Sequence, residues 1–348
     1  AAVGKLTRDA LQATGQWDAL KAKTLVFKAT VNDVATDVKL GAVDAGIVWD
    51  ATIKQIPGLE AVPLPQLAGK QAHMTAGVLT SSTQPTATLR FARYLSARDR
   101  GLKHMEQAGF TPVEGDVWAE KPDLRLFSGS MLKVAVENTI NAFEQREGVN
   151  VTRVYNGCGI LVAQMKAGSH PDAYFACEKS FMTQVNDLFV DPVDISSNRL
   201  VIVVHKGNPH DVKTLKDLGK PGLRVGVGHE QQCALGAITE QTLKEGGQLA
   251  NVSKNIKVRT PTGDMLVNQL RTKSLDAVIV YISNAAGLDD IEAFSIEGIP
   301  CATAVQPMAV GKNSPHQQLA RRLMETLRSA HSQKQFESYG FQWQNSKQ

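Results

Sequence analysis

Four short segments rich in glycine, serine and cysteine could together bind an anion. A helix start presents unpaired backbone N–H groups and the positive end of the helix dipole. Glycine at such a start removes side-chain bulk and lets backbone donors approach an anion. Several such segments could hold a dianion without arginine or lysine. The four predicted strand-to-helix junctions are Ser128-Gly129-Ser130, Asn156-Gly157-Cys158-Gly159, Gln231-Gln232-Cys233-Ala234 and Thr262-Gly263-Asp264.

The elements that must position these segments alternate between strand and helix. Ser130 is expected to cap a helix whose apolar face includes Leu132, Val136 and Ile140, and this helix is predicted to stop at Gly148. Two further helices are predicted to begin just after Gln232 and Gly263. Alternation of this kind predicts parallel sheets with helices on both faces, in which the junctions meet at the carboxyl edge. The predicted strands cover residues 124–128, 149–155, 172–176, 200–204, 223–227 and 276–281.

Composition restricts the class of protein. With 348 residues, the chain suits two or three domains, and its net charge of +4 comes without a run of Lys or Arg that would indicate nucleic-acid binding. No apolar run reaches the length of a membrane span. The chain opens on Ala1-Ala2-Val3-Gly4-Lys5 without a signal peptide and runs into an amphipathic helix, so a processed or truncated start is expected.

The chain has four cysteines, Cys158, Cys177, Cys233 and Cys301, and none lies in a CxxC pair that would indicate structural zinc. Cys158 and Cys233 fall at predicted helix starts, where a thiol can acquire a lowered pKa. A cysteine enzyme is not favoured, because no histidine falls at a recognisable partner spacing. Simple burial of small side chains remains an open alternative for these cysteines.

The sequence repeats itself at an offset of 232 residues. Gly4 and Leu11 recur as Gly236 and Leu243, and the run Asp44-Ala45 with Ile47-Val48 recurs as Asp276-Ala277 with Ile279-Val280. Residues 123–232 have no counterpart before the first copy. Residues 1–112 are therefore interpreted as the rear part of a module that lacks central strands and exposes apolar edges. Residues 113–122, which are mostly polar, are predicted to be a linker.

Residues 123–345 resemble the molybdate-binding components of ABC importers, which are type II periplasmic substrate-binding proteins. The resemblance is carried by the order of several short motifs, and residues 1–112 resemble the rear part of the same family. The matching motifs are Ser128-Gly-Ser-Met-Leu132, Asn156-Gly-Cys-Gly-Ile-Leu161, Gln164-Met-Lys-Ala-Gly168, Pro171-Asp-Ala-Tyr-Phe175, Ser197-Asn-Arg-Leu-Val-Ile-Val-Val204, Asp276-Ala-Val-Ile-Val-Tyr281 and Gly340-Phe341.

The resemblance implies an α/β fold of two lobes with mixed, mostly parallel sheets and a hinge. Lobe A would comprise residues 123–200 and 303–345, and lobe B residues 201–302. Between them the lobes would capture a small oxyanion, most plausibly molybdate. The ligand residues implied by position are Ser128, Ser130, Cys158, Gly159, Cys233, Ala234, Thr262, Gly263 and Tyr281.

Two cysteines depart from the family pattern and leave the ligand open. Cys158 stands where the family usually has a serine, and Cys233 stands at the third loop; a thiol is a poorer donor than a hydroxyl. The alternative is a soft metal or a sulfur-containing ligand held by Cys158, Cys177 and Cys233. In either case the resemblance implies a non-enzymatic, periplasmic or extracytoplasmic protein that needs no cofactor. Its expected partners are the membrane subunits of an ABC importer, and no nucleic acid.

Overall fold

The computed structural model describes residues 2–344, so the predicted module end at residue 345 lies outside the described residues. The chain divides into two compact units. The first unit runs to Gln84 and includes Phe91–Trp118. The second comprises Pro85–Arg90 and the residues from Ala119 onward. Between residues 2 and 344, no helix has both the length and the apolar character needed to cross a bilayer.

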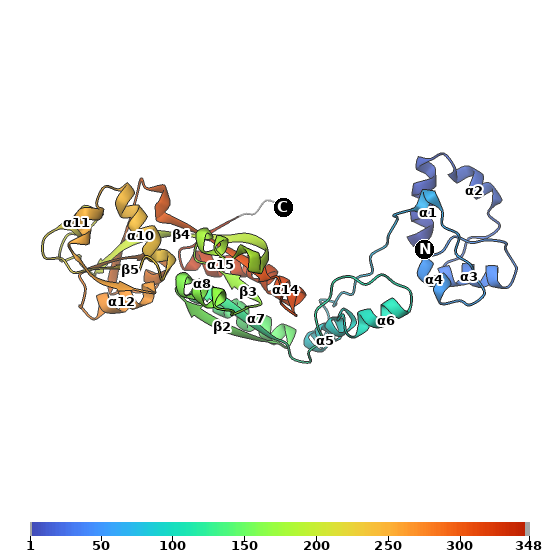
Figure 1. Cartoon of the computed structure of the whole chain (residues 1–348), viewed down its shortest axis with the longest axis horizontal. Coiled ribbons are helices and arrows are strands. Elements are labelled where there is room, and N and C mark those ends of the chain that lie inside the picture. Colours follow the sequence, from blue (N-terminus) through green and yellow to red (C-terminus); the bar gives the residue numbers. More distant parts are fainter. Residues whose placement is uncertain (1, 345–348) are drawn as a thin grey trace. The chain divides into compact units, whose positions relative to one another are not determined.

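Within residues 2–118 the first unit contains helices and irregular segments but no strand (Figure 1). The predicted amphipathic helix at the start is confirmed as α1, whose buried residues are Thr7 and Leu11. Apolar segments elsewhere remain uncovered: Leu25 is 80% exposed and Phe27 is 68% exposed. The helices are α1 (Ala2–Ala13), α2 (Trp17–Lys23), α3 (Val31–Lys39), α4 (Asp50–Lys54), η1 (Pro65–Leu67), α5 (Pro85–Leu95, which crosses into the second unit) and α6 (Gly101–Gln107).

The second unit contains two sheets, and the first of them forms lobe A. Its strand order is β2-β1-β3-β9-β4, with β10 also paired to β4. The β2, β1 and β3 strands are parallel, and the remaining pairs are antiparallel. The strands are β1 (Asp123–Gly129), β2 (Asn150–Asn156), β3 (Ala173–Phe175), β4 (Phe189–His205), β9 (Thr303–Gly311) and β10 (Gln342–Trp343). The helices are η2 (Ser130–Leu132), α7 (Lys133–Glu147), α8 (Cys158–Lys166), α9 (Lys179–Thr183), η3 (Asn186–Leu188), α14 (Gln317–Leu327) and α15 (Ala330–Ser338).

The second sheet forms lobe B. The β6, β5 and β7 strands run parallel, and the end of β4 pairs antiparallel with both β7 and β8. Figure 1 shows α10, α11 and α12 gathered around this sheet. The strands are β5 (Val225–Gly228), β6 (Ile256–Thr260), β7 (Ala277–Tyr281) and β8 (Ile291–Ser295). The helices are η4 (Asp217–Gly219), α10 (Ala234–Glu245), α11 (Leu249–Ser253), α12 (Gly263–Arg271), α13 (Ile282–Ala285) and η5 (Pro300–Ala302).

The long strand β4 joins the two lobes. Arg199 pairs with Thr303 of β9 in lobe A, and the next residue, Leu200, pairs with Tyr281 of β7 in lobe B. Leu200 to Val204 are almost fully buried, as expected for a strand covered on both faces. The expected two-lobed α/β fold of the type II periplasmic binding proteins is confirmed.

Local expectations differ from the structure in three respects. Ser130 was expected to cap the long helix, but it begins the 3₁₀ turn η2, and α7 starts only at Lys133. The predicted stop is confirmed, because Gly148 ends α7 with φ of +65°. The β4 strand extends well before the predicted Leu200–Val204, and β6, β8, β9 and β10 were not predicted.

The core of lobe A predicts a large effect of one aromatic truncation. Phe336 is fully buried and packs its ring against Phe175, Phe341 and Trp343, with ring centroids 6.1, 5.2 and 5.6 Å away. We expect Phe336→Ala to lower the free energy of unfolding by about 3–5 kcal/mol. Urea unfolding measures the change. The half-exposed Val134→Ala on α7 is the control and should shift stability by less than about 0.5 kcal/mol; equal losses in both variants would contradict the packing described.

Candidate functional site

The first and second loops of lobe A meet at two cysteines. An added Cβ at Gly129, the last residue of β1, would collide with the Sγ atom of Cys177 and lie 3.2 Å from that of Cys158. Only glycine therefore fits at this position. Ser128, just before it, is fully buried, and its hydroxyl donates to the Gly129 carbonyl at 3.4 Å.

Cys158 is the first residue of α8 and is completely buried. The preceding turn is closed by the Gly157 amide, which donates to the Asn156 side chain at 2.9 Å. The Cys158 Sγ atom accepts a hydrogen bond from the amide of Cys177 at 3.1 Å. Because Cys177 follows β3, the ends of β1 and β3 and the start of α8 converge on this pair of sulfur atoms.

Lobe B contributes two more helix starts. Cys233 precedes α10, and its thiol donates to the carbonyl oxygens of His229 at 3.5 Å and Thr260 at 3.6 Å. The α12 helix begins at Gly263, where an added Cβ would lie only 2.5 Å from the side-chain oxygen of Asn284. Both starts are thus tightly packed and have little room for a larger residue.

The loops of the two lobes touch each other directly. The amides of Gly159 and Ile160, in the first turn of α8, both donate to the carbonyl oxygen of Gln232, at 3.0 and 3.3 Å. An added Cβ at Gly157 would lie 2.5 Å from the carbonyl oxygens of both Gln232 and Pro261. The second loop of lobe A therefore faces the third and fourth loops of lobe B, and the lobes are closed on each other here.

Two tyrosines add hydroxyl groups to this region. Tyr281 ends β7 and Tyr174 lies in β3, and both are almost fully buried. The Tyr281 hydroxyl has no hydrogen-bond partner among the described residues, whereas the Tyr174 hydroxyl lies beside the Cys158 thiol. Burial, together with the negative potential of nearby thiol groups and Glu178, raises the pKa of Tyr281 well above its ordinary value. A hydroxyl that stays protonated and lacks a partner can donate to an anion.

The thiols differ in their acidity. Burial raises the pKa of Cys158, but hydrogen bonds from the thiol and amide of Cys177, with the nearby Tyr174 hydroxyl, outweigh it and lower the pKa. The hydrogen bond to Cys158, followed by burial, raises the pKa of Cys177 well above its usual range. Burial raises the pKa of Cys233 to about 11. Any negative charge in this cluster therefore belongs to Cys158.

The structure brings several of the expected ligand residues to one region. Cys158, Gly159 and Cys233 meet across the lobes, and the pKa of Tyr281 responds to the cysteines. Ser130 and Thr262 are partly exposed, and their side chains are not among those that meet at the cysteines. The expected ligand set did not include Tyr174, which the alternation of side chains along β3 could have indicated. It also did not include the Gln232 carbonyl, because a backbone carbonyl gives no signal in the sequence.

The alternative of a three-cysteine soft-metal site is not supported. Within the part of the chain that the structure describes, no group of three or more His, Cys, Asp or Glu side chains is arranged to hold a metal ion. Two of the thiols face each other in lobe A, whereas Cys233 uses its proton on backbone carbonyls of lobe B.

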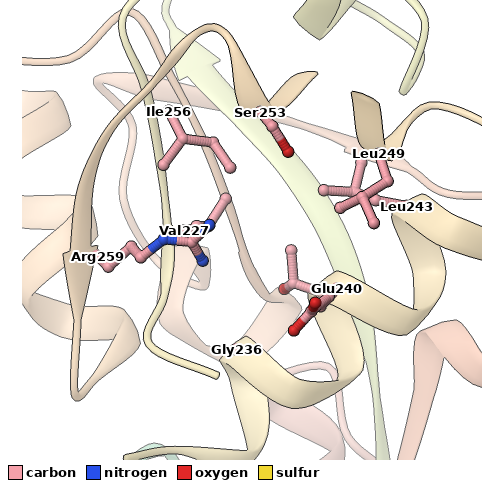
Figure 2. A pocket seen from close by; sticks show the side chains of 9 residues that line it. Val227, Gly236, Glu240, Leu243, Leu249, Ser253, Ile256 and Arg259 are labelled. Atoms are coloured by element: carbon pink, nitrogen blue, oxygen red, sulfur yellow. The ribbon is translucent and has the colours of Figure 1, made fainter. Parts of the chain in front are cut away.

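A separate cavity of about 130 Å³ lies within lobe B (Figure 2). It opens between α10 and the β5 and β6 strands, and none of the expected ligand residues lines it. Its charged lining residues are Glu240 and Arg259, and Arg259 is already paired with Glu230 at 3.0 Å. This cavity is not part of the region where the lobes meet.

Comparison with known proteins identifies the family. Residues 1–111 and 124–342 of the chain match the family of bacterial extracellular solute-binding proteins. The molybdate-binding protein ModA of Mycobacterium tuberculosis is 26% identical over 199 residues, which is 56% of this chain and 74% of that protein.

Solved structures show the same fold. The periplasmic molybdate-binding protein of Azotobacter vinelandii matches with a TM-score of 0.55 and 17% identity over 63% of this chain and 98% of that chain. The sulfate-binding protein SubI of M. tuberculosis matches with a TM-score of 0.56 and 17% identity over 65% and 88%. The chain belongs to the bacterial extracellular solute-binding proteins, a family of binding proteins and not of enzymes.

Proposed function

We propose that residues 123–345 capture a small tetrahedral oxyanion, molybdate above all, between the two lobes and deliver it to an ABC importer. The observation that carries the proposal is the meeting of helix starts from both lobes beside the buried, unpartnered hydroxyl of Tyr281. Molybdate and sulfate, named for the similar proteins, are both tetrahedral dianions. The proposed partners are the membrane subunits of such an importer, which places the protein outside the cytoplasm.

Backbone donors would carry the binding energy. Hydrogen bonds to a charged acceptor contribute about 1.5–3 kcal/mol each, and burial excludes the water that would weaken them. The α8, α10 and α12 helices each direct a positive end toward the junction of the lobes. The Tyr281 hydroxyl would add a side-chain donor to these backbone donors around the oxyanion. The proposed ligand residues are Ser128, Ser130, Cys158, Gly159, Cys233, Ala234, Thr262, Gly263 and Tyr281.

Entry of the ligand requires the lobes to separate. The Gln232 carbonyl now occupies the amides of Gly159 and Ile160, so an oxyanion must replace this contact. The lobes are connected where β4 passes from Arg199 to Leu200 and where the chain returns into β9. Bending at these crossings is a hinge motion that leaves each sheet intact.

We further propose that residues 1–112 are the rear part of a second module, joined through residues 113–122 to the complete one. By the offset of 232, residues 24–28 correspond to β6 and residues 45–49 to β7. Neither segment forms a strand in the first unit, and the residues that would correspond to β4 and β5 are not among residues 1–112. Leu25 and Phe27 are exposed, as expected for a sheet-forming segment that has no neighbouring strand in the first unit.

The first prediction concerns ligand class. Molybdate or tungstate should raise the melting temperature of the protein, because a ligand at 100 times its Kd adds about 2.7 kcal/mol of stability. Differential scanning fluorimetry measures the shift. Sugars and amino acids at the same concentration are the controls and should leave the melting temperature unchanged. The absence of a shift with molybdate, tungstate and sulfate alike would refute oxyanion binding.

The second prediction concerns Tyr281. Because its buried hydroxyl has no partner, Tyr281→Phe should leave the stability of the ligand-free protein unchanged or slightly raised. The same change should weaken molybdate binding about tenfold by removing one donor to a charged oxygen. Isothermal titration calorimetry measures the affinity, with Tyr339→Phe at the end of α15 as the control. Unchanged affinity would exclude Tyr281 from the site.

The third prediction concerns the first unit. Amides in residues 24–28 and 45–49 should exchange hydrogen for deuterium rapidly, because they lack sheet hydrogen bonds. Amides of the corresponding strand β7 should exchange slowly, since β7 is buried between β4 and β5. Mass spectrometry of peptic peptides gives both rates from one sample. Equally slow exchange in the two copies would contradict the proposal of an incomplete module.

A further inference from the structure

The ligand region contains a pair of thiols that oxyanion binding does not require. Cys158 is completely buried and Cys177 is 5% exposed, and all four cysteines are unpaired in this structure. The Cys177 amide donates to the Cys158 Sγ atom at 3.1 Å, and the two thiols lie within hydrogen-bonding reach of each other. Two sulfur atoms held this closely could be joined with only small side-chain rotations.

The backbone around the pair leaves room for this contact. The Cys177 thiol occupies the space that a Cβ atom would take at Gly129, and the Cys158 thiol lies 3.2 Å from the same point. Any larger residue at the end of β1 would push the thiols away. The glycine thus does more than open a turn, because it lets two sulfur atoms meet beneath the first loop.

The other two cysteines have different surroundings. The Cys233 thiol donates to two backbone carbonyls of lobe B, and Cys301 lies beside the Thr242 hydroxyl at 3.6 Å. Cys158 and Cys177 both belong to lobe A, so joining them would not tie the lobes together. The pair also contains Cys158, whose pKa is lower than that of the other three thiols. A thiol with a lower pKa forms more thiolate, which is the form that attacks a disulfide.

We propose that Cys158 and Cys177 form a reversible disulfide that sets the oxyanion affinity of the site between the lobes. This inference rests on the proposed function for its effect on affinity, but not for the bond itself. Disulfides form and persist in the extracytoplasmic compartments where proteins of this family work.

The reaction is an exchange with an external disulfide. The Cys158 thiolate attacks one sulfur of that disulfide and releases one thiol, which leaves a mixed disulfide on Cys158. Cys177 then loses its proton and attacks the Cys158 sulfur, which releases the second thiol. The two cysteines are oxidised by two electrons, and the external disulfide is reduced to two thiols. Opening of the lobes gives the external disulfide access to the buried pair.

The bond would change the site in two ways that act in the same direction. It fixes the start of α8 to the end of β3, so less of the second loop must be ordered when a ligand binds. It also removes the thiol whose pKa is lowered, so that no charge can form on that sulfur and repel a dianion from neighbouring amides. Both effects favour tighter binding by the oxidised protein.

The test uses the whole chain equilibrated in oxidised or reduced glutathione. Mass spectrometry after alkylation should find a Cys158–Cys177 linkage in the oxidised sample, with Cys233 and Cys301 alkylated. Calorimetry should show the oxidised protein binding molybdate about tenfold more tightly than the reduced protein. Cys177→Ser should abolish the difference between the two conditions, whereas Cys301→Ser should retain it.

Separate results would overturn the inference and the proposed function. A pair that stays reduced, or that links to Cys233 instead, overturns the assignment of the disulfide. A disulfide at the assigned pair with unchanged molybdate affinity overturns its control of binding. Failure of both redox forms to bind molybdate, tungstate or sulfate overturns the proposed function, while the linkage found by mass spectrometry still decides the disulfide.

Discussion

The arrangement of the complete module depends on one strand that belongs to two sheets. Hydrogen bonds bind β4 to β9 as far as Arg199 and to β7 and β8 from Leu200 onward. Because these bonds fix register on both sides, neither lobe can slide along the other. Bending at the crossing remains possible, since it changes few of these bonds. The loops of the two lobes therefore meet at one place, and bending at the crossing moves them apart. A two-lobed clamp needs both properties.

The direct contact between lobes shows what a ligand must displace. A protein carbonyl at Gln232 now accepts from two amides of α8, and it carries only a partial negative charge. A dianion in that place would meet the same donors with full charge, so its interaction with the helix start is stronger. The buried Tyr281 hydroxyl has no partner among the described residues in the closed state, which leaves part of the donor set unsatisfied. Closure without a ligand is therefore costly at the positions that an oxyanion would satisfy.

Much of this could be predicted from sequence, because the strong signals were local. Small and polar residues at the strand-to-helix junctions located the starts of α8, α10 and α12, and Gly148 located the end of α7. The extent of β4 could not be predicted, because residues 196–199, just before Leu200, are polar and pair only through tertiary contacts with β9 and β10. The prediction that Ser130 caps the long helix was wrong, because the chain first forms the 3₁₀ turn η2 at that point. The closeness of Cys158 and Cys177 also could not be predicted from the sequence. It depends on Gly129, which has no side chain to keep the two thiols apart.

The thiols change the electrostatics of the region more than its shape. A hydroxyl at Cys158 would stay neutral and donate, whereas this thiol accepts from the Cys177 amide and has a lowered pKa. A buried site built from amides attracts any negative charge, and an ionised sulfur inside it competes with a dianion for the same donors. The pKa of Cys177 is raised mainly by its hydrogen bond to Cys158, and burial raises the pKa values of Cys233 and Tyr281. Of the thiols in this region, Cys158 is therefore the one whose ionisation would compete with the proposed oxyanion for the backbone amides.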